Sequence, residues 1–165
     1  MEKAIEIRNL IYEVNGKRIL DGVSLDVYKG EIMGIVGPSG EGKTTFLRLL
    51  LHLIEPKEGE IIINGKNILQ MSEMELNEVR KKIGMVFQYS ALFDSLRVWE
   101  NVAFPLLRHL KISEEEAKKR AREKLRVVGL VDVEELYPHQ LSGGMQKRVA
   151  LARALALDPE IILYD

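Results

Sequence analysis

The residues with the clearest chemical potential form one glycine-rich run, Gly37–Thr44, which reads Gly-Pro-Ser-Gly-Glu-Gly-Lys-Thr. Its glycines let the backbone curl so that consecutive N–H groups point inward, where they can hold an anion. The lysine and threonine complete the G-x-x-x-x-G-K-[ST] spacing of loops that bind nucleotide phosphates. We expect Lys43 to reach the β- and γ-phosphates of ATP and the Thr44 hydroxyl to bind Mg²⁺. A glycine-rich turn with a solvated lysine is the alternative.

The segments on either side of this loop fit its predicted role. Ile32–Val36 is nearly all apolar, as expected for a strand of a parallel sheet that is covered on both faces. Thr44–Leu53 carries apolar residues at helical spacing, and the positive end of such a helix would add to the anion site. Thr45 would lie beside the α-phosphate. The predicted nucleotide-binding residues of the loop are Gly37, Pro38, Ser39, Gly40, Glu41, Gly42, Lys43, Thr44 and Thr45.

Turn and cap signals divide the rest of the chain into strands and helices. Asn-Gly pairs mark hairpin turns in a β-rich start, and two capping boxes mark the beginnings of later helices. The turns are Asn15-Gly16 and Asn64-Gly65, and the capping boxes are Ser72 with Glu75 and Ser113 with Glu116. The predicted strands include Leu20–Val27, Glu60–Ile63 and Glu160–Asp165, and the helix that starts at Ser113 is expected to reach about Val128.

A second motif, Leu141–Gln146, reads Leu-Ser-Gly-Gly-Met-Gln and opens another predicted helix. Ser142 can cap that helix, while Gly143 and Gly144 permit close backbone approach to an anion. The motif therefore predicts a second helix end that contacts phosphate. An ordinary capped helix is the alternative.

This segment, with Lys147–Leu155 and the Asp158-Pro159 stop, resembles the signature segment of ABC ATPases, and the resemblance covers Ile5 to Asp165. In that family the signature faces the γ-phosphate held by the opposite subunit. The resemblance thus implies a head-to-tail dimer with a second ATPase subunit, in which Ser142 acts in trans on one of two sandwiched ATP molecules. Met145 stands where many ABC proteins have glutamine.

Three further positions fit the resemblance. Gln88 looks like the Q-loop glutamine, which touches Mg²⁺ or the attacking water and senses the transmembrane partner; a surface glutamine is the alternative. Tyr12 looks like the aromatic that stacks on adenine, or it is a packed strand residue. Ile161–Asp165 resembles the Walker B strand, with Asp165 holding the Mg²⁺ shell or lying at the surface. The implied catalytic residues are Lys43, Gln88, Asp165 and Ser142, and the implied metal ligands are Thr44, Gln88 and Asp165. His139 is assigned no catalytic role.

The implied fold is α/β: a P-loop NTPase with a RecA-like parallel core sheet, an N-terminal antiparallel β subdomain and an α-helical insertion. The core sheet is expected to be incomplete. A single ABC ATPase domain would span residues 1–165. Its expected parts are the β subdomain (1–30 and 59–70), the P-loop core (31–56), the helix and Q-loop (71–89), the helical insertion (90–140), and the signature helix with the Walker B strand (141–165).

Composition argues against several classes of protein. The 24 basic and 25 acidic side chains give a net charge of -1, so no positive field favours nucleic acid as a partner. No apolar run approaches the roughly 18 residues of a membrane span. The sequence has no cysteine, which excludes a disulfide framework and is compatible with the cytosol.

The stretch from Ser90 to Leu106 is unusually apolar, and in ABC cassettes this region receives a coupling helix from the membrane permease. Phe93, Leu96 and Trp99 are the predicted contacts, although core packing accounts for many of these side chains. The stretch and the Leu-Ser-Gly-Gly-Met variant look like ATPases of Mla/MCE-type lipid transport. Cytoplasmic location on the inner face of the membrane, through the permease, is implied.

Other functions share some of these motifs. Importers of amino acids or methionine and macrolide-type exporters remain alternatives within transport. Soluble ABC ATPases use a long coiled-coil insertion or two cassettes, and Gly37 to Leu141 leaves no room for a coiled coil. A P-loop kinase would not need Leu141–Gln146.

The resemblance also bears on the end of the chain. In the family, the glutamate that polarises the attacking water follows the Walker B aspartate, and the D-loop and switch histidine come later. We therefore expect a truncated piece that binds ATP but hydrolyses it negligibly, whereas the full-length protein is an ATP hydrolase. The strand after Walker B would lie beside Ile32–Val36, so a gap or edge is expected there, and a marginally stable fragment.

Overall fold

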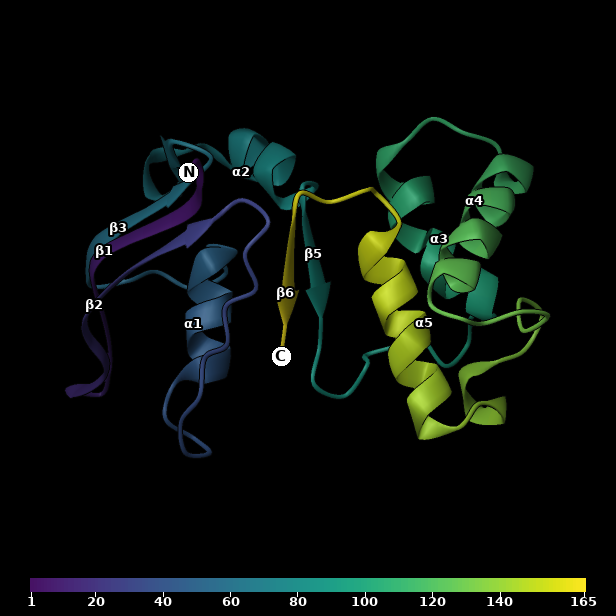
Figure 1. The fold of residues 1–165 in the computed structure, drawn as a ribbon, viewed down its shortest axis with the longest axis horizontal. Coiled ribbons are helices and arrows are strands. Elements are labelled where there is room, and N and C mark those ends of the chain that lie inside the picture. The colour runs from purple at the N-terminus through teal and green to yellow at the C-terminus, as the bar shows by residue number, and fades with distance from the viewer. The chain divides into compact units, whose positions relative to one another are not determined.

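The computed structural model describes residues 1–165, and the chain divides into two units, Met1–Arg80 and Lys81–Asp165 (Figure 1). The boundary falls within the segment 71–89 that was expected to form one part. No helix combines the length and apolar content needed to cross a membrane.

The first unit is built on a four-stranded antiparallel sheet. Strand β1 (Lys3–Val14) pairs on one side with β2 (Lys17–Tyr28) and on the other with β3 (Glu58–Ile63). The short strand β4 (Lys66–Asn67) pairs with β3, so the order in the sheet is β2-β1-β3-β4. Both predicted Asn-Gly turns are confirmed. Their residues have φ of 49° and 76° at 15–16 and of 48° and 77° at 64–65, the left-handed pair that a two-residue hairpin turn needs.

Helix α1 (Lys43–Leu50) confirms the helix predicted after the glycine loop, and it buries Phe46, Leu49 and Leu50 at helical spacing. A short helix η1 (Ile68–Gln70) and α2 (Glu73–Arg80) complete the unit. The Arg80 guanidinium donates to the carbonyls of Leu51 (2.9 Å) and His52 (3.0 Å) just after α1. These hydrogen bonds satisfy carbonyls that have no partner within the helix.

The predicted strand at Ile32–Val36 is wrong. The segment forms no strand, and Ile32 and Val36 are 98% and 97% exposed. An extended apolar segment becomes a strand only where a neighbour completes its hydrogen-bond ladder, and no strand pairs with these residues. The expectation of an incomplete sheet beside this run is thereby confirmed.

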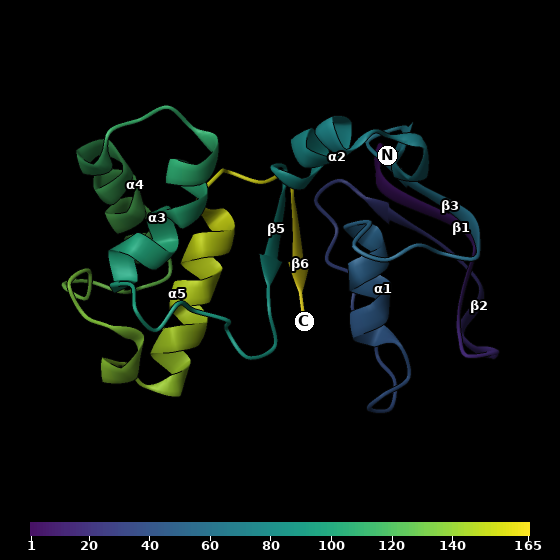
Figure 2. The same cartoon turned by 180° about the vertical axis from the view of Figure 1, so that it is seen from behind.

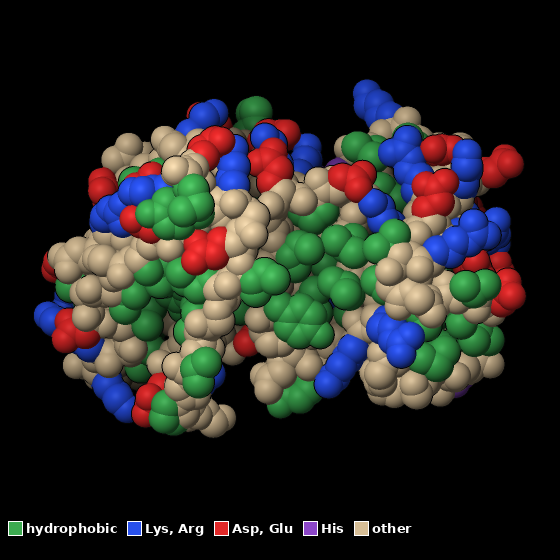
Figure 3. Space-filling view, viewed as in Figure 1, with side chains coloured by type: hydrophobic (Ala, Val, Ile, Leu, Met, Phe, Trp, Pro, Cys, Tyr) green, Lys and Arg blue, Asp and Glu red, His purple; other side chains and the backbone are tan.

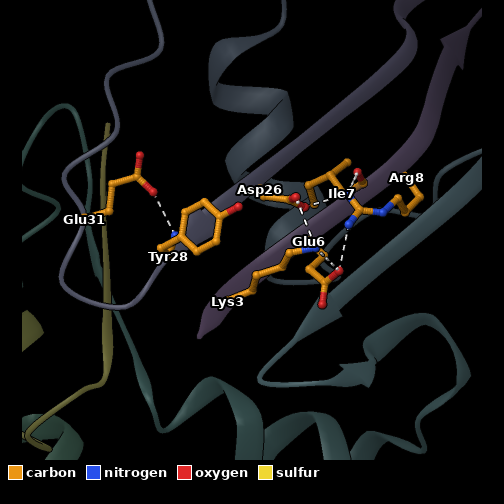
Figure 4. Close-up of polar contacts among 7 residues, drawn as sticks. All are labelled: Lys3, Glu6, Ile7, Arg8, Asp26, Tyr28 and Glu31. Atoms are coloured by element: carbon orange, nitrogen blue, oxygen red, sulfur yellow. Dashed lines mark hydrogen bonds and ion pairs between the residues drawn. The ribbon is translucent and has the colours of Figure 1, made fainter. Parts of the chain in front are cut away.

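Charged side chains on β1 and β2 form a network across the strand pair (Figure 4). Arg8 donates through Nη1 to Asp26 Oδ1 (2.6 Å) and through Nη2 to Glu6 Oε2 (2.7 Å), while Lys3 Nζ lies 3.2 Å from Asp26 Oδ2. The hydrogen bond from Arg8, with a smaller contribution from Lys3, holds the pKa of Asp26 below its ordinary value. Folding therefore favours the ionised carboxylate.

The replacement Asp26→Asn should lower stability at neutral pH by an amount that shrinks in acid. A carboxylate whose pKa falls on folding contributes stability above its unfolded pKa, about 4, and loses that contribution as the pH falls through its folded pKa. Urea unfolding of both proteins between pH 7 and pH 3 measures the difference. A difference that stays constant over this range would show that packing, not charge, is responsible.

The second unit combines a two-stranded parallel sheet with three helices (Figures 1 and 2). Strand β5 (Ile83–Val86) pairs in parallel with β6 (Ile161–Tyr164). Helices α3 (Val98–His109), α4 (Glu114–Val127) and α5 (Gly143–Leu155) pack together, and a short helix η2 (Pro138–Gln140) precedes α5. The residues buried between the helices include Val98, Trp99, Val102, Ala103, Ala117, Ala121, Leu125, Val149 and Ala152.

The two predicted capping boxes differ in detail. At α2 both halves are present, since Ser72 N donates to Glu75 Oε2 (2.8 Å) and Glu75 N donates to Ser72 Oγ (3.4 Å). At α4, Ser113 Oγ accepts from Glu116 N (3.1 Å), but the Glu116 carboxylate pairs with Arg120. The helix is thus capped as predicted by its serine.

Candidate functional site

The glycine loop leads directly into α1 through two left-handed residues. Gly40 and Gly42 have φ of 82° and 96°, and Gly42 is the residue that caps α1. A Cβ at Gly42 would lie 2.8 Å from Ile19 Cγ2, so both the backbone conformation and the packing against β2 require glycine. The loop thus runs directly into the N-terminus of α1, the positive end of the helix dipole, where an anion binds favourably.

The residues of this loop fit the phosphates of a nucleotide. A Cβ at Gly37 or Gly40 would meet no atom within 4 Å, so these positions border open space. The Lys43 ammonium donates to the carbonyls of Gly37 (2.6 Å) and Pro38 (2.5 Å), which holds the cation across the start of the loop. Thr44 is the second residue of α1, and binding of Mg²⁺ by its hydroxyl remains a prediction.

Tyr12 lies in the same unit as the loop. It is half-buried in β1 and pairs with Leu20 of β2. Leu20 Cδ2 and Ile19 Cγ2 are the side-chain atoms nearest to a Cβ built on Gly42. The tyrosine is therefore one strand away from residues that border the loop, and its stacking on adenine remains a prediction.

Gln88 and Asp165 follow adjacent parallel strands of the second unit. Val86 of β5 pairs with Tyr164 of β6, and Asp165 N donates to Val86 O (3.0 Å). Both residues thus emerge at the carboxyl ends of the strands, the edge where ligands bind in open α/β sheets. Gln88 is exposed, so its amide is available to a ligand.

The loop that carries Gln88 has an unusual backbone. Ser90 N donates to Phe87 O (3.0 Å), which closes a turn with Gln88 in its second position. Ser90 and Ala91 then adopt left-handed conformations, with φ of 63° and 48°. Such conformations cost non-glycine residues on the order of 1–3 kcal/mol each, so neighbouring contacts must hold them in place.

The signature motif begins α5 as predicted. Ser142 Oγ accepts from Met145 N (3.2 Å), and Ser142 O accepts from Gln146 N (2.9 Å). A Cβ at Gly143 or Gly144 would meet nothing within 4 Å. Glycine is a poorer helix former than alanine, and packing within this chain gives no reason for glycine at either position. Close approach of a ligand or partner to this end of the helix would explain why both positions are glycine.

Signature helix α5 and strand β5 are packed in unusually close contact. A Cβ at Gly84 would lie 2.5 Å from Ala154 O, so only glycine allows this approach. Met145 packs against the helical core, and Gln146 Nε2 donates to Pro138 O (2.9 Å) in η2. The Gln88 loop and the signature helix therefore belong to one packed body.

The prediction that Trp99 contacts a membrane partner is wrong. Trp99 is only 6% exposed and lies in the core between the helices, because its large ring fills the space where α3 faces α4. Phe93 is 44% exposed and contacts Phe104 with 4.8 Å between ring centroids, while Leu96 is half-buried. Phe104 is 43% exposed, so both rings reach the surface. Hydrophobic side chains also gather on the face of the molecule that Figure 3 shows.

Two residues near this surface were missed from the sequence. Asn101 is completely buried; its Oδ1 accepts from Phe93 N (2.8 Å), and its Nδ2 donates to the carbonyls of Phe93, Leu96 and Arg97. Arg153 donates to the carbonyls of Ser90 and Ala91. A polar residue within an apolar helical pattern was the available signal in both cases. His139 in η2 stacks on Tyr137, the residue before that helix, with 5.9 Å between ring centroids.

The site residues thus fall into two sets. The first unit carries Tyr12 and the Gly37–Thr45 loop, and the second carries Gln88, Asp165 and the signature helix α5. A metal site shared by Thr44, Gln88 and Asp165 remains a prediction.

Comparison with known proteins gives consistent results. The chain is 46% identical over its whole length to a "Probable ribonucleotide transport ATP-binding protein mkl" of Mycobacterium leprae, covering 48% of that protein. It is 44% identical over 99% of its length to the "Intermembrane phospholipid transport system ATP-binding protein MlaF" of Haemophilus influenzae, covering 62% of it. The chain therefore spans less than two thirds of these curated relatives.

Solved structures agree at the level of the fold. The ATP-binding cassette MJ0796, described as a dimer in a post-hydrolysis state bound to ADP and Pi, superposes with a TM-score of 0.87 and 40% identity, over 98% of this chain and 73% of that one. CbiO1 of Clostridium perfringens superposes with a TM-score of 0.88 and 29% identity, over 100% of this chain and 66% of that one. The family profile described as "ABC transporter" matches residues 20–165, most of the sequence. The chain belongs to the ABC transporter family.

Proposed function

We propose that this chain binds Mg·ATP on the Gly37–Thr45 loop as the energy-supplying part of a transporter. The observation that carries the proposal is the loop itself: left-handed glycines, open space beside them, the start of α1 and the Lys43 ammonium all meet at one point. The backbone N–H groups would hold the phosphates, and Lys43 would add the positive charge that the β- and γ-phosphates require.

Bound Mg²⁺ would neutralise charge that develops on the phosphates. Thr44, Gln88 and Asp165 are the residues of this chain that would hold it, with oxygen donors of the kind that Mg²⁺ prefers. Tyr12 would stack on the adenine, and Gln88 would also orient the attacking water. In the full-length protein the result would be ATP hydrolysis.

A second copy of the ATPase would complete each nucleotide site. Gly143 and Gly144 leave the start of α5 open while weakening the helix, a combination that favours close approach by an external phosphate. Ser142 caps this end and would contact the γ-phosphate on the partner in a head-to-tail dimer. MJ0796, which resembles this chain over most of its length, is described as dimeric.

Lipid is the transport substrate that we propose, and a membrane permease is the partner. The name of the MlaF relative, an intermembrane phospholipid transport ATP-binding protein, supports this choice. The exposed Phe93 and Phe104 pair would receive an apolar permease helix, which would place the protein on the inner face of the membrane. The name of the mkl relative favours ribonucleotides as the second candidate.

Purification of the full-length protein with its permease, followed by reconstitution in phospholipid vesicles, tests this proposal. We expect Mg-dependent ATP hydrolysis and ATP-dependent transfer of labelled phospholipid to acceptor vesicles. Hydrolysis coupled to ribonucleotide movement, with no lipid transfer, would favour the second candidate. Retention of Mg·ATP binding after the loop is disrupted by Gly42→Trp would contradict the nucleotide site itself.

A further inference from the structure

The Arg153 side chain, in the last turn of α5, reaches back to the loop that follows Gln88. Its Nη1 donates to Ala91 O (2.8 Å) and its Nη2 donates to Ser90 O (2.7 Å). Arg153 is more than 60 positions from Ser90 and Ala91 in sequence, but all three residues lie in the same unit. Partial burial lowers the pKa of the Arg153 guanidinium, which nevertheless stays protonated at neutral pH because arginine titrates far above it.

The two carbonyls that Arg153 holds belong to the residues with the least favourable backbone in the loop. Ser90 and Ala91 both have positive φ, although neither is glycine. Ser90 is buried, and its N–H closes the turn through Phe87 O that has Gln88 in its second position. The conformation that presents Gln88 therefore depends on contacts made by its neighbours, and Arg153 makes two of them.

An arginine suits this task better than a lysine. Its planar guanidinium presents parallel N–H groups in a fixed fork, so two successive carbonyls can be held at once and in one orientation. The ammonium group of a lysine could also donate to both carbonyls, but it has no fixed geometry that would hold them in one orientation. Because the hydrogen bonds involve a charged donor, they are stronger than those of a neutral side chain.

We propose that Arg153 is a positioning residue for Gln88: it locks the left-handed Ser90–Ala91 backbone and so fixes the glutamine relative to the signature helix. The proposal rests on the catalytic role proposed above for Gln88. Through this clamp, a displacement of α5 when the signature engages its partner would move the Gln88 loop with it.

A double-mutant cycle in the full-length ATPase with its permease tests the proposal. Arg153→Met is expected to reduce kcat for ATP by about 10- to 100-fold, the loss that a misplacement of about 1 Å can bring. The Kd for Mg·ATP should change by less than about twofold, since the phosphate loop is untouched. Arg153→Lys should recover part of the rate. Arg126→Met, the same change at an exposed position of α4, should leave kcat unchanged.

The combination with Gln88→Ala separates positioning from general destabilisation. If Arg153 acts through Gln88, adding Arg153→Met to Gln88→Ala should lower kcat no further. Losses that multiply in the double variant, or a wild-type rate for Arg153→Met, would overturn the role of Arg153 while leaving that of Gln88 intact. A wild-type rate for Gln88→Ala alone would instead refute the catalytic role of Gln88, and with it the present proposal.

Discussion

Replacing Lys43 by alanine is expected to weaken Mg·ATP binding by about 10- to 150-fold. The ammonium is the only side-chain cation that the structure places on the glycine loop, where it already bonds to the carbonyls of Gly37 and Pro38. Its loss removes charge-assisted contacts to phosphate, worth about 1.5–3 kcal/mol. Isothermal titration calorimetry on the full-length protein measures the change in Kd.

Lys17→Ala provides the control for that experiment. Lys17 lies exposed at the start of β2, and its replacement changes the net charge equally without touching the loop. Thermal unfolding in the absence of nucleotide checks that both variants fold. An affinity for ATP that falls equally in the two variants would trace the effect to general electrostatics. Unchanged affinity in Lys43→Ala would remove the loop from the binding site.

Features that depend on neighbours in sequence could be predicted. The Asn-Gly pairs at 15–16 and 64–65 require positive φ, and both form the predicted turns. Ser113 and Ser142 cap helices where their side chains can reach an N–H three residues ahead. The glycine loop was predictable for the same reason, since its left-handed residues and the start of α1 are local properties.

Features that depend on residues far away in the sequence could not be predicted. The apolar pattern of Ile32–Val36 indicates a strand, but a ladder needs a partner, and the structure pairs none with it. Trp99 lies in an apolar stretch that could equally be a surface or a core, and the packing of α3 on α4 decides for the core. Arg153 contacts carbonyls more than 60 residues away, a distance over which sequence spacing carries no information.

The signature helix shows where stability and the proposed function conflict. Alanine is a better helix former than glycine, and the structure leaves room for a methyl group at both Gly143 and Gly144. The sequence nevertheless has glycine at both positions, next to the serine that caps the helix. Where a residue lowers stability although the structure has room for a more stabilising one, a functional role is the expected reason.

The replacement Ser142→Arg should block ATP-dependent dimerisation while leaving nucleotide binding by the monomer intact. The substitution removes the cap, which costs about 0.5–2 kcal/mol, and places a long side chain where the proposed partner phosphate must approach the backbone. The phosphate loop lies in the other unit, so the Kd for Mg·ATP should stay within about twofold of wild type. Sedimentation velocity of the full-length protein with a slowly hydrolysed ATP analogue separates monomer from dimer.

Ser113→Arg is the matched control, because it removes the same kind of cap from α4 without altering the signature. Loss of the dimer in both variants would indicate destabilisation of the second unit, whereas a dimer that survives Ser142→Arg would contradict the sandwich arrangement.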